Sequence, residues 1–417
     1  MVRIAIFALG SRGDIEPYIA LAQGLVRSGQ TVRVVTNEDF TVLVKSYGLD
    51  VWPIDVSVEA ALRAKNAAAA MEGGGFFSAF RVLREHAERG ARRLIEIGGE
   101  AAKDVDVIVT GFSGLFVASA LSEKLGIPLV QAYNIPLTPT AAWAGALFPW
   151  MSFPPRSLAH QLSHRLTRLA VWQVSRSAGE RARKEMLGLG GTSPFGLSES
   201  PLTSARPVIY GFSEAVLPRP PDWDARTVIT GYWFANEPPG FTPDAALARF
   251  LDDGEPPVYV GFGSMSSEQP EHTLRLVLDA VGSRRALIHA GWGGLSSSSL
   301  PKNVHGIASV PHSWLFPRTA AVVHHGGAGT SGAAFRAGVP VVVVPFHGDQ
   351  LFWAMRAEAL GVGPAPLPRK SLTSVKLRDA IEGVLNDAAK RARARELGAA
   401  IAKEDGVARA VAVIVSG

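Results

Sequence analysis

The sequence predicts an α/β protein of two doubly wound domains, each a parallel sheet with helices on both faces. The chain has 417 residues. That is more than one hydrophobic core usually serves, so two domains of roughly 200 residues each are expected, with a cleft between them. Short β-branched runs alternate with longer amphipathic segments, as strands and their connecting helices do. The runs are apolar throughout, which is typical of parallel strands buried on both faces.

The apolar runs fall into two series separated by the proline-rich stretch LPRPPDWD. Prolines stiffen a chain into an extended form, so we expect a linker at residues 218–226 between an N-terminal domain at 1–217 and a C-terminal domain at 227–417. Residues 390–416 have helical spacing of apolar side chains, and we expect them to pack back onto the first domain. The expected strands are 3–9, 31–36, 105–110 and 127–130, then 228–230, 258–262, 286–289, 321–324 and 339–344.

Composition excludes several classes of protein. Forty-two basic and 37 acidic residues leave a formal charge of only +5, which gives little support to nucleic-acid binding. The chain has no cysteine, so disulfides, thiolate metal sites and cysteine nucleophiles are excluded. The N-terminal apolar run is short and meets Asp14 without a small-residue cleavage site. We interpret this run as a strand rather than a secretion signal, and expect a cytoplasmic protein.

A long uncharged stretch tests the expectation that no segment crosses a membrane. No charged residue occurs between Lys124 and Arg156, and a membrane span would have that property. Six prolines interrupt the stretch, however, and each removes an amide donor that a lipid-spanning helix needs. We therefore expect no transmembrane segment.

The most informative motif is a glycine-rich turn in AAVVHHGGAGTSGAAFRAG. A buried strand runs into it and a helix of small residues follows, so free amides and a helix N-terminus are presented to an anion. Gly327 and Gly329 let the backbone approach closely, Thr330 caps the helix or donates its hydroxyl, and His325 donates an N–H to a phosphate oxygen. A diphosphate fits this site; the alternative is a helix start that needs glycine for tight packing.

A second interpretation of the turn is a dinucleotide site. The sequence from Gly327 to Gly332 matches G-x-G-x-x-G, and Asp349 follows about twenty residues later, as in nicotinamide-dependent oxidoreductases. The turn follows a late strand, however, and Asp349 lies beyond PFHG rather than at the tip of the next strand. Asp349 and Gln350 together offer an acceptor and a two-way amide, which suits neighbouring sugar hydroxyls. The alternative for this pair is a helix cap.

The first strand is followed by GSRGD, at the edge of the sheet where open α/β folds bind ligands. Asp14 should therefore face the cleft. Sugar transfer needs a group that takes the proton of the attacking alcohol, and no histidine occurs in the first 85 residues. Asp14 is thus the candidate base, with an N-cap as the alternative. Arg12 either faces the diphosphate or pairs with Glu16, and Ser11 is a weaker candidate for the donor site.

Two Asp-x-Asp pairs raise the question of a divalent metal, which many sugar transferases hold in this way. Asp104 and Asp106 enter a strand from its amino-terminal side, and Asp222 and Asp224 lie in the expected linker. Both pairs fit helix ends and turns better than a metal site, so no metal is expected. The negative charge of the leaving group would then be stabilised by the helix dipole, the backbone amides, His325 and Arg12.

The stretches GSRGDIEPYIALA, PHSWLFPRTAAVVHHGGAGT and PFHGDQLFW resemble the sterol glucosyltransferase branch of the family 1 glycosyltransferases. Bacterial glycosyltransferases that modify antibiotics are also similar. The resemblance spans the chain apart from about residues 55–100 and 135–205. It implies a GT-B fold of two Rossmann-like domains and an inverting displacement without metal or cofactor. The hexose, most simply glucose from uridine diphosphate glucose, would pass to a lipophilic alcohol.

The resemblance also implies roles for individual residues. Asp14 would be the counterpart of the family's base, with the donor held mainly by the second domain. Ser264 matches a serine that meets the phosphates. The remaining donor residues implied are His325, Gly327, Ala328, Gly329 and Thr330 at the diphosphate, and Asp349 and Gln350 at the sugar hydroxyls.

The chain departs from the plant members at three positions. Those proteins have a histidine base, a tryptophan that stacks on the nucleobase and a glutamate for the ribose, where this chain has Asp14, Ser309 and Ala333. The nucleobase would then be held by the backbone of Val310 and by Trp292. Uridine and thymidine both stay open, so a thymidine diphosphate deoxysugar transferase is the alternative, as is a catalytically silent binding protein.

The acceptor site is expected on the proline-rich segment that follows a first-domain strand. Large apolar side chains there can clamp an apolar aglycone near the cleft. The alternative is a local core under a long loop. The residues concerned are Trp143, Phe148, Trp150, Met151 and Phe153.

Overall fold

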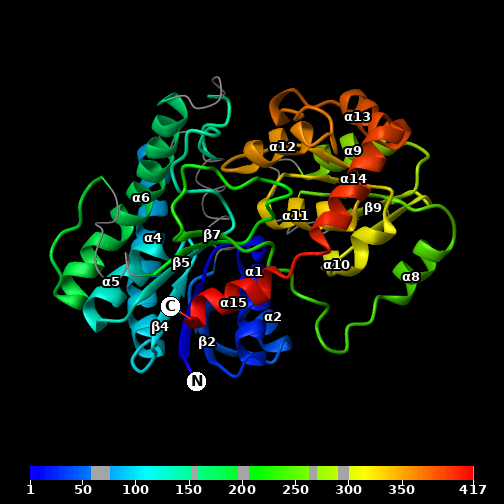
Figure 1. Ribbon diagram of the computed structural model, residues 1–417. Helices are drawn as coiled ribbons and strands as arrows, with labels where there is room; N and C mark the ends of the chain where they lie inside the picture. Colours follow the sequence, from blue (N-terminus) through cyan, green and yellow to red (C-terminus); the bar gives the residue numbers. More distant parts are fainter. Residues whose placement is uncertain (58–75, 152–157, 196–205, 263–269, 290–299, 417) are drawn as a thin grey trace.

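The computed structural model of the chain describes residues 1–57, 76–151, 158–195, 206–262, 270–289 and 300–416. Within these ranges two parallel sheets lie side by side, with helices packed around them (Figure 1). The first sheet has seven strands in the order β3-β2-β1-β4-β5-β6-β7, and the second has five in the order β10-β9-β8-β11-β12. This confirms the predicted architecture of two α/β domains.

The first sheet is covered on both faces, which explains its apolar strands. In β1 the side chains from Ile4 onward are buried, and in β4 all four are. The elements of this part of the chain are β1 (Arg3–Ala8), α1 (Arg12–Arg27), β2 (Thr31–Asn37), η1 (Glu38–Phe40), α2 (Thr41–Ser46), β3 (Asp50–Ile54), α4 (Phe76–Ala101), β4 (Val107–Thr110), α5 (Leu115–Leu125), β5 (Leu129–Tyr133), α6 (Leu158–Leu187), β6 (Val208–Tyr210) and β7 (Thr227–Ile229).

The second sheet is shorter and its core is rich in valine, with β12 reading VVV and fully buried. Its elements are α8 (Ala245–Asp252), β8 (Val258–Gly261), α9 (Pro270–Val281), β9 (Ala286–His289), β10 (Val304–Ile307), α10 (His312–Leu315), η4 (Phe316–Arg318), β11 (Ala321–His324), α11 (Ala328–Ala337), β12 (Val341–Val343), α12 (Gln350–Ala359), η5 (Arg369–Ser371), α13 (Ser374–Asn386), α14 (Ala388–Ile401) and α15 (Gly406–Ser416).

Each sheet reverses its winding direction at one point, and the two points face each other. In the first sheet the order turns at β1, between β2 and β4, and in the second at β8, between β9 and β11. Ligands of open α/β sheets bind outside the carboxyl ends of the strands at such points. Helices α1 and α11 begin there and contact each other.

The predicted domain boundary is wrong. Residues 228–230 were expected to open the second sheet, but β7 pairs in parallel with β6, with Val208 opposite Thr227. The proline-rich stretch at 218–226 is a crossover within the first domain, because Trp223 stacks on Tyr210 with ring centroids 5.0 Å apart. The chain passes to the second domain only after Ile229.

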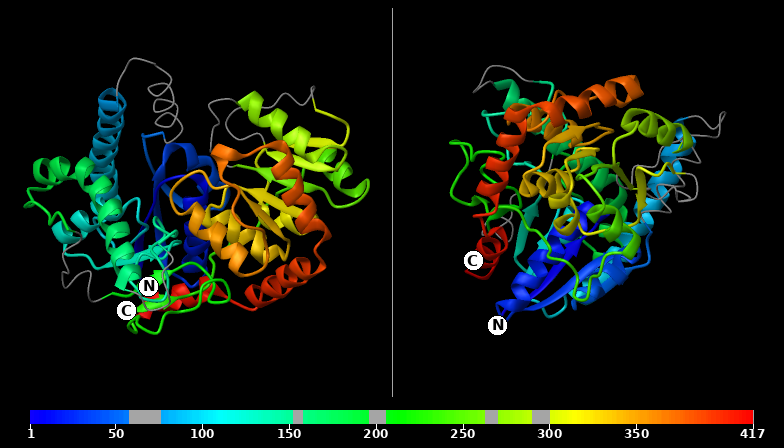
Figure 2. Two further views of the ribbon diagram at one scale, coloured as in Figure 1. Left: turned by 90° about the horizontal axis from the view of Figure 1, so that it is seen from above. Right: turned by 90° about the vertical axis from the view of Figure 1, so that its right-hand side faces the viewer.

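The C-terminal segment forms two helices rather than one, and only the second of them returns to the first domain. Helix α14 packs on α11, and α15 packs on α1. Ala410 and Ile414 of α15 are buried in the same apolar cluster as Ile15 and Ile19 of α1. Figures 1 and 2 show the consequence, with both termini at the first domain.

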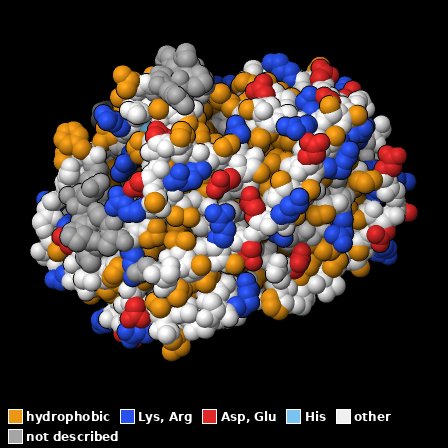
Figure 3. Space-filling model, viewed as in Figure 1, with side chains coloured by type: hydrophobic (Ala, Val, Ile, Leu, Met, Phe, Trp, Pro, Cys, Tyr) orange, Lys and Arg blue, Asp and Glu red, His pale blue; other side chains and the backbone are white. Residues whose placement is uncertain are grey.

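The surface agrees with the small net charge. On the face drawn in Figure 3, basic and acidic side chains are interspersed. No helix among the described residues combines the length and the apolar character that crossing a membrane requires.

Candidate active site

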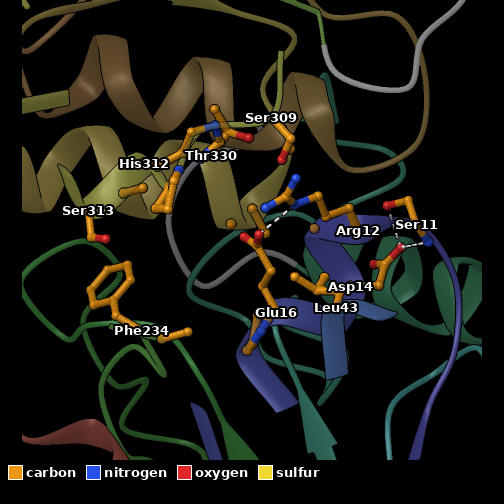
Figure 4. A pocket seen from close by; sticks show the side chains of 18 of the residues that line it. Ser11, Arg12, Asp14, Glu16, Leu43, Phe234, Ser309, His312, Ser313 and Thr330 are labelled. Carbon is orange, nitrogen blue, oxygen red and sulfur yellow. Dashed lines mark hydrogen bonds and ion pairs between the residues drawn. The ribbon is translucent and has the colours of Figure 1, made fainter. Parts of the chain in front are cut away.

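A cavity of about 1620 Å³ lies between the two domains, at the carboxyl ends of both sheets. Figure 4 shows part of its wall, with side chains from α1 facing the second domain. Most of the site residues predicted from the sequence line this cavity. They are Ser11, Arg12, Asp14, Val310, His325, Gly327, Ala328, Gly329, Thr330, Asp349 and Gln350.

Asp14 is fixed at the first turn of α1. Its Oδ2 accepts hydrogen bonds from the backbone N–H and the hydroxyl of Ser11, both at 2.8 Å. Gly10 precedes this turn with a φ of 122°, and a Cβ there would lie 2.6 Å from Asp14 Oδ2, so only glycine fits. The carboxylate is therefore both a helix-capping group and part of the cavity wall.

The environment of Asp14 favours its protonated form. Burial raises the pKa of the Asp14 carboxyl, and the hydrogen bonds from Ser11 oppose this rise. No hydrogen bond among the described residues uses Oδ1. A carboxylate with one oxygen held and one oxygen open, and with a raised pKa, is suited to accept a proton.

A second carboxyl group faces Asp14 from the other domain. Asp349 precedes α12, and its Oδ2 accepts a hydrogen bond from Trp353 Nε1 at 2.8 Å. Burial raises the pKa of Asp349 to about 6, with a further upward contribution from the charge of Asp14 and an opposing one from Trp353. Both carboxyl groups line the same cavity, although they are 335 residues apart in the chain.

The neighbouring Gln350 has a structural contact as well. Its Oε1 accepts hydrogen bonds from the backbone N–H groups of Phe346 at 2.8 Å and His347 at 3.1 Å. This oxygen therefore shapes the loop before α12, a role that the sequence did not suggest.

The glycine-rich turn has the geometry of an anion site. Gly326 has a φ of 92°, and a Cβ there would lie 2.7 Å from the carbonyl oxygen of Gln350, so the chain needs glycine. Gly327 is the N-cap of α11, whose first amides open into the cavity. His324 is fully buried, and its Nδ1 accepts a hydrogen bond from Gly326.

His325 lies over the start of α11. A Cβ on Gly327 would be 2.5 Å from His325 Nε2, which places this nitrogen at the helix N-terminus. Its Nδ1 is buried and has no hydrogen-bond partner among the residues that the structure describes. Burial lowers the pKa of His325 to about 4, with smaller contributions from His312 and His347. The imidazole is thus neutral near neutral pH and can donate one N–H to an anion.

Arg12 pairs with Glu16. Its Nε lies 2.6 Å from Glu16 Oε1, and both side chains line the cavity. In Figure 4 the guanidinium extends from α1 toward Ser309 of the second domain. Two roles were expected for Arg12, a contact with the diphosphate or an ion pair with Glu16. The structure shows the ion pair.

The two Asp-x-Asp pairs lie outside the cavity lining. Asp104 pairs with Arg33 at 2.6 Å, and Asp106 pairs with Arg3 at 2.8 Å. The hydrogen bonds from Arg3 lower the pKa of Asp106 to about 2. In the second pair, Asp222 accepts hydrogen bonds from Thr140 Oγ1 and Ala141 N, and Asp224 from Arg226 and Thr227.

The described residues also contain no group of three or more His, Cys, Asp or Glu side chains placed to hold a metal. Three predicted site residues, Phe153, Ser264 and Trp292, lie outside the described ranges.

The described members of the predicted acceptor set do not line the cavity. Trp143 packs edge-on against Trp223, with ring centroids 5.9 Å apart. Phe148 packs in the same way on Trp150, which is largely exposed. Among the described members of the set, Trp143, Phe148, Trp150 and Met151 are all absent from the wall. Trp143, Phe148 and Trp150 therefore pack against other aromatic side chains rather than around the cavity, as the alternative of a local core under a loop predicts.

Apolar side chains from other segments line the cavity instead. Phe112 follows β4 and Ile135 follows β5, while Phe234 and Phe241 lie on the crossover to the second domain. No motif marks these residues. The only available signal was that Phe112 and Ile135 come directly after buried strands, at the edge where Asp14 was expected.

Comparisons with known proteins agree with this geometry. Residues 4–142 match the glycosyltransferase family 28 N-terminal domain, and residues 286–413 match the erythromycin biosynthesis protein CIII-like C-terminal domain. A sterol 3-beta-glucosyltransferase of Arabidopsis thaliana is 33% identical over 425 residues, which cover 98% of this chain and 67% of that protein. The chain spans about two thirds of the length of such plant relatives and about 30% of that of the fungal ones.

Solved structures share the fold. The glycosyltransferase of kitacinnamycin has a TM-score of 0.69 at 19% identity, covering 100% of this chain and 98% of that one. A Streptomyces sp. SF2575 glycosyltransferase complexed with thymidine diphosphate has a TM-score of 0.60 at 19% identity, covering 100% of both chains. With two matching sheets, a cavity between them and relatives similar along nearly all of its length, the chain belongs to the GT-B glycosyltransferases, in the branch of the sterol 3-beta-glucosyltransferases.

Proposed function

We propose that the chain transfers a hexose from a nucleoside diphosphate sugar to a hydroxyl group of a lipophilic alcohol, with inversion at the sugar carbon and without a metal. One observation carries the proposal. Asp14, a carboxylate with an open oxygen, lines the same cavity as the N-terminus of α11. A base and an anion site on the wall of one cavity are what a direct displacement requires.

The reaction can then proceed in one step. The acceptor hydroxyl donates a hydrogen bond to Asp14 Oδ1, and its oxygen attacks the anomeric carbon. The bond from that carbon to the diphosphate oxygen breaks, and its electron pair leaves with the diphosphate. The hydroxyl proton passes to Asp14, whose raised pKa makes its carboxylate a stronger base.

The diphosphate would be received by the second domain. The first amides of α11, from Ala328 to Thr330, point into the cavity with the positive end of the helix dipole. His325 adds a neutral N–H donor beside them. This arrangement stabilises the negative charge that develops on the leaving group without a metal ion.

The donor proposed first is uridine diphosphate glucose, because the curated relatives are named as glucosyltransferases. Asp349 would accept hydrogen bonds from the sugar hydroxyls. A thymidine diphosphate sugar is the second candidate, since one structure of the same fold is a complex with thymidine diphosphate. Ser309 and Ala333, which line the cavity, carry no side chain that selects between the two bases.

The acceptor proposed is a sterol or a similar lipophilic alcohol. Phe112 follows β4, which pairs with β1, and Ile135 follows β5, the next strand of the sheet. Both side chains would contact the aglycone. Apolar walls with a few polar groups are typical of sites for such ligands.

Two measurements test the proposal. The first is a thermal-shift panel with EDTA present, comparing uridine and thymidine diphosphates, their glucose conjugates and a nicotinamide dinucleotide. Saturation at about a hundred times Kd adds about 2.7 kcal/mol to the unfolding free energy. The second is the anomeric configuration of the product formed from a sterol. A requirement for a divalent metal, or a product with retained configuration, would contradict the mechanism.

A further inference from the structure

The first half of α6 exposes a row of leucines. Leu158, Leu162 and Leu166 are 83%, 51% and 38% exposed, and their spacing of four residues places them on one face of the helix. Trp150, on the loop that leads to α6, is 63% exposed. Single exposed apolar side chains are ordinary, but a row aligned on one face of a helix is typical of a contact surface.

The opposite face of these turns is polar and buried. His164 Nε2 lies 3.1 Å from the carbonyl oxygen of Trp143, and Ser163 Oγ accepts a hydrogen bond from Gly145 N–H at 2.8 Å. Burial lowers the pKa of His164 to about 4, so its ring is neutral. Polar side chains of α6 thus bind the segment that contains Trp143 and Gly145, while its leucines face outward. A surface helix normally buries its apolar face and exposes its polar one. The buried polar side chains are His160, Ser163, His164 and Thr167.

The exposed row also carries positive charge. Arg165 and Arg168 are exposed, and neither forms an ion pair with a described residue. From Leu158 to Gly179 the helix contains no Asp or Glu, and the first acid is Glu180. A helix with exposed leucines and with arginines but no acids has the composition of segments that lie on anionic lipid surfaces.

We propose that this lipid-docking face, made of Trp150, Leu158, Leu162 and Leu166 with Arg165 and Arg168, binds the surface of an anionic lipid bilayer. The apolar side chains would enter the acyl boundary, and the arginines would meet the headgroup phosphates. The docking does not depend on the transfer chemistry.

One consequence does rest on the proposed function. Asn134 and Ile135, which line the cavity, begin the described segment that carries Trp150 of the docking face. On a membrane, this segment would join the lipid surface to the wall of the acceptor site. A lipophilic alcohol dissolved in the bilayer would be taken up from there.

A second copy of the chain could also cover this face, but the charges of Arg165 and Arg168 disfavour such a dimer. A symmetric contact through the leucines would bring Arg165 and Arg168 of two copies together. This half of the helix has no Asp or Glu that could neutralise these arginines. Anionic headgroups neutralise the same arginines.

Vesicle co-sedimentation tests the proposal without donor or acceptor. The full chain is mixed with vesicles of phosphatidylcholine, with and without phosphatidylglycerol. We expect binding to the anionic vesicles, weakened by salt. The double variant Arg165→Glu/Arg168→Glu should bind at least about 25-fold more weakly, since each basic residue near the surface contributes about fivefold. The double variant Leu158→Ser/Leu162→Ser should bind the anionic vesicles at least about tenfold more weakly than the wild type.

Matched controls come from exposed residues of the second domain. Val375→Ser, at a side chain that is 57% exposed, and Lys302→Glu/Lys370→Glu should bind like the wild type. Absence of wild-type binding would overturn the proposal, as would equal losses in the controls. A wild-type dimer that Leu158→Ser/Leu162→Ser converts to a monomer, measured by light scattering, would assign the face to self-association instead. Failure of glucose transfer alone would leave the docking result standing and would contradict only the proposed function.

Discussion

A Cβ atom on Gly329 would lie 3.3 Å from the carbonyl oxygen of Gly13, so α11 and α1 touch at their first turns through two glycines. Both helices present N-terminal ends at this contact, where the helix dipoles are positive. The two positive helix ends repel each other, and an anion bound between them would reduce this repulsion. We therefore expect that the proposed diphosphate, held mainly by α11, would also lie close to the first turn of α1.

The first prediction concerns this contact. Gly329→Val should lower kcat/KM by about tenfold or more, because the added methyl groups separate the first turns and misplace Asp14 against the donor. The melting temperature should change little, since only the interface between domains is touched. Gly383→Val in α13 is the matched control, because nothing lies within 4 Å of its Cβ position. Equal kinetics for the two variants would show that the helix contact is not needed for transfer.

The second prediction concerns Asp14. Asp14→Asn should reduce kcat by about a hundred- to ten-thousand-fold, because asparagine accepts the Ser11 hydrogen bonds but does not take the acceptor proton. Donor affinity and melting temperature should stay close to wild type. Asp244→Asn, at the N-cap of α8, is the control for capping alone. Turnover of Asp14→Asn within tenfold of wild type would leave Asp14 as a capping residue.

The third prediction is a pH dependence of donor binding. Asp349 accepts sugar hydroxyls best as a carboxylate, so affinity for uridine diphosphate glucose should rise as pH increases through about 6, the pKa of this buried group. Asp14→Asn removes a negative neighbour and should shift the midpoint to lower pH. Calorimetric titration across this range measures both. An unshifted midpoint in Asp14→Asn would mean that the two carboxyl groups do not interact.

Stability gives an independent check of the same group. A carboxyl whose pKa is raised on folding from 3.8 to about 6 is protonated more readily in the folded chain than in the unfolded one. The free energy of unfolding should therefore decrease as pH rises from about 4 to about 6 and then level off. Asp349→Asn should lack this contribution in thermal melts.

The fourth prediction concerns His325. His325→Ala should weaken binding of uridine diphosphate and slow transfer, because a donor beside the helix N-terminus is lost. A hydrogen bond to a charged group contributes about 1.5–3 kcal/mol, which is roughly ten- to a hundredfold in affinity. His272→Ala, at an exposed histidine of α9, should behave like the wild type. Unchanged affinity in His325→Ala would return the imidazole to a packing role.

The fifth prediction separates the acceptor wall from the aromatic loop. Phe112→Ala should raise KM for a sterol acceptor several-fold while KM for the donor stays fixed, since Phe112 lines the cavity beside β4. Trp150→Ala should leave both constants unchanged when the acceptor is supplied in detergent, because Trp150 lies outside the wall. The opposite result would restore the aromatic loop as the acceptor site.

Much of the candidate site could be predicted from the sequence because it depends on short-range backbone requirements. Gly10 and Gly326 stand where the backbone takes positive φ and where a side chain would collide, so glycine is required at both places. Asp14 lies three residues after Ser11, the spacing of a capped first helical turn. Such signals depend on a few neighbouring residues, and they locate helix starts and anion sites without knowledge of the rest of the chain.

The sequence by itself determined the two α/β units, the glycine turns and the residues that open α1 and α11, because strand burial and helix capping are local requirements. Only the tertiary structure decided that β7 completes the first sheet, that Phe234 lines the cavity and that Trp150 does not. These outcomes depend on contacts between segments far apart in the chain, such as Gly13 with Gly329. Hydrophobic burial drives such contacts but does not specify the partner, so the pattern that buries a side chain leaves open which surface covers it.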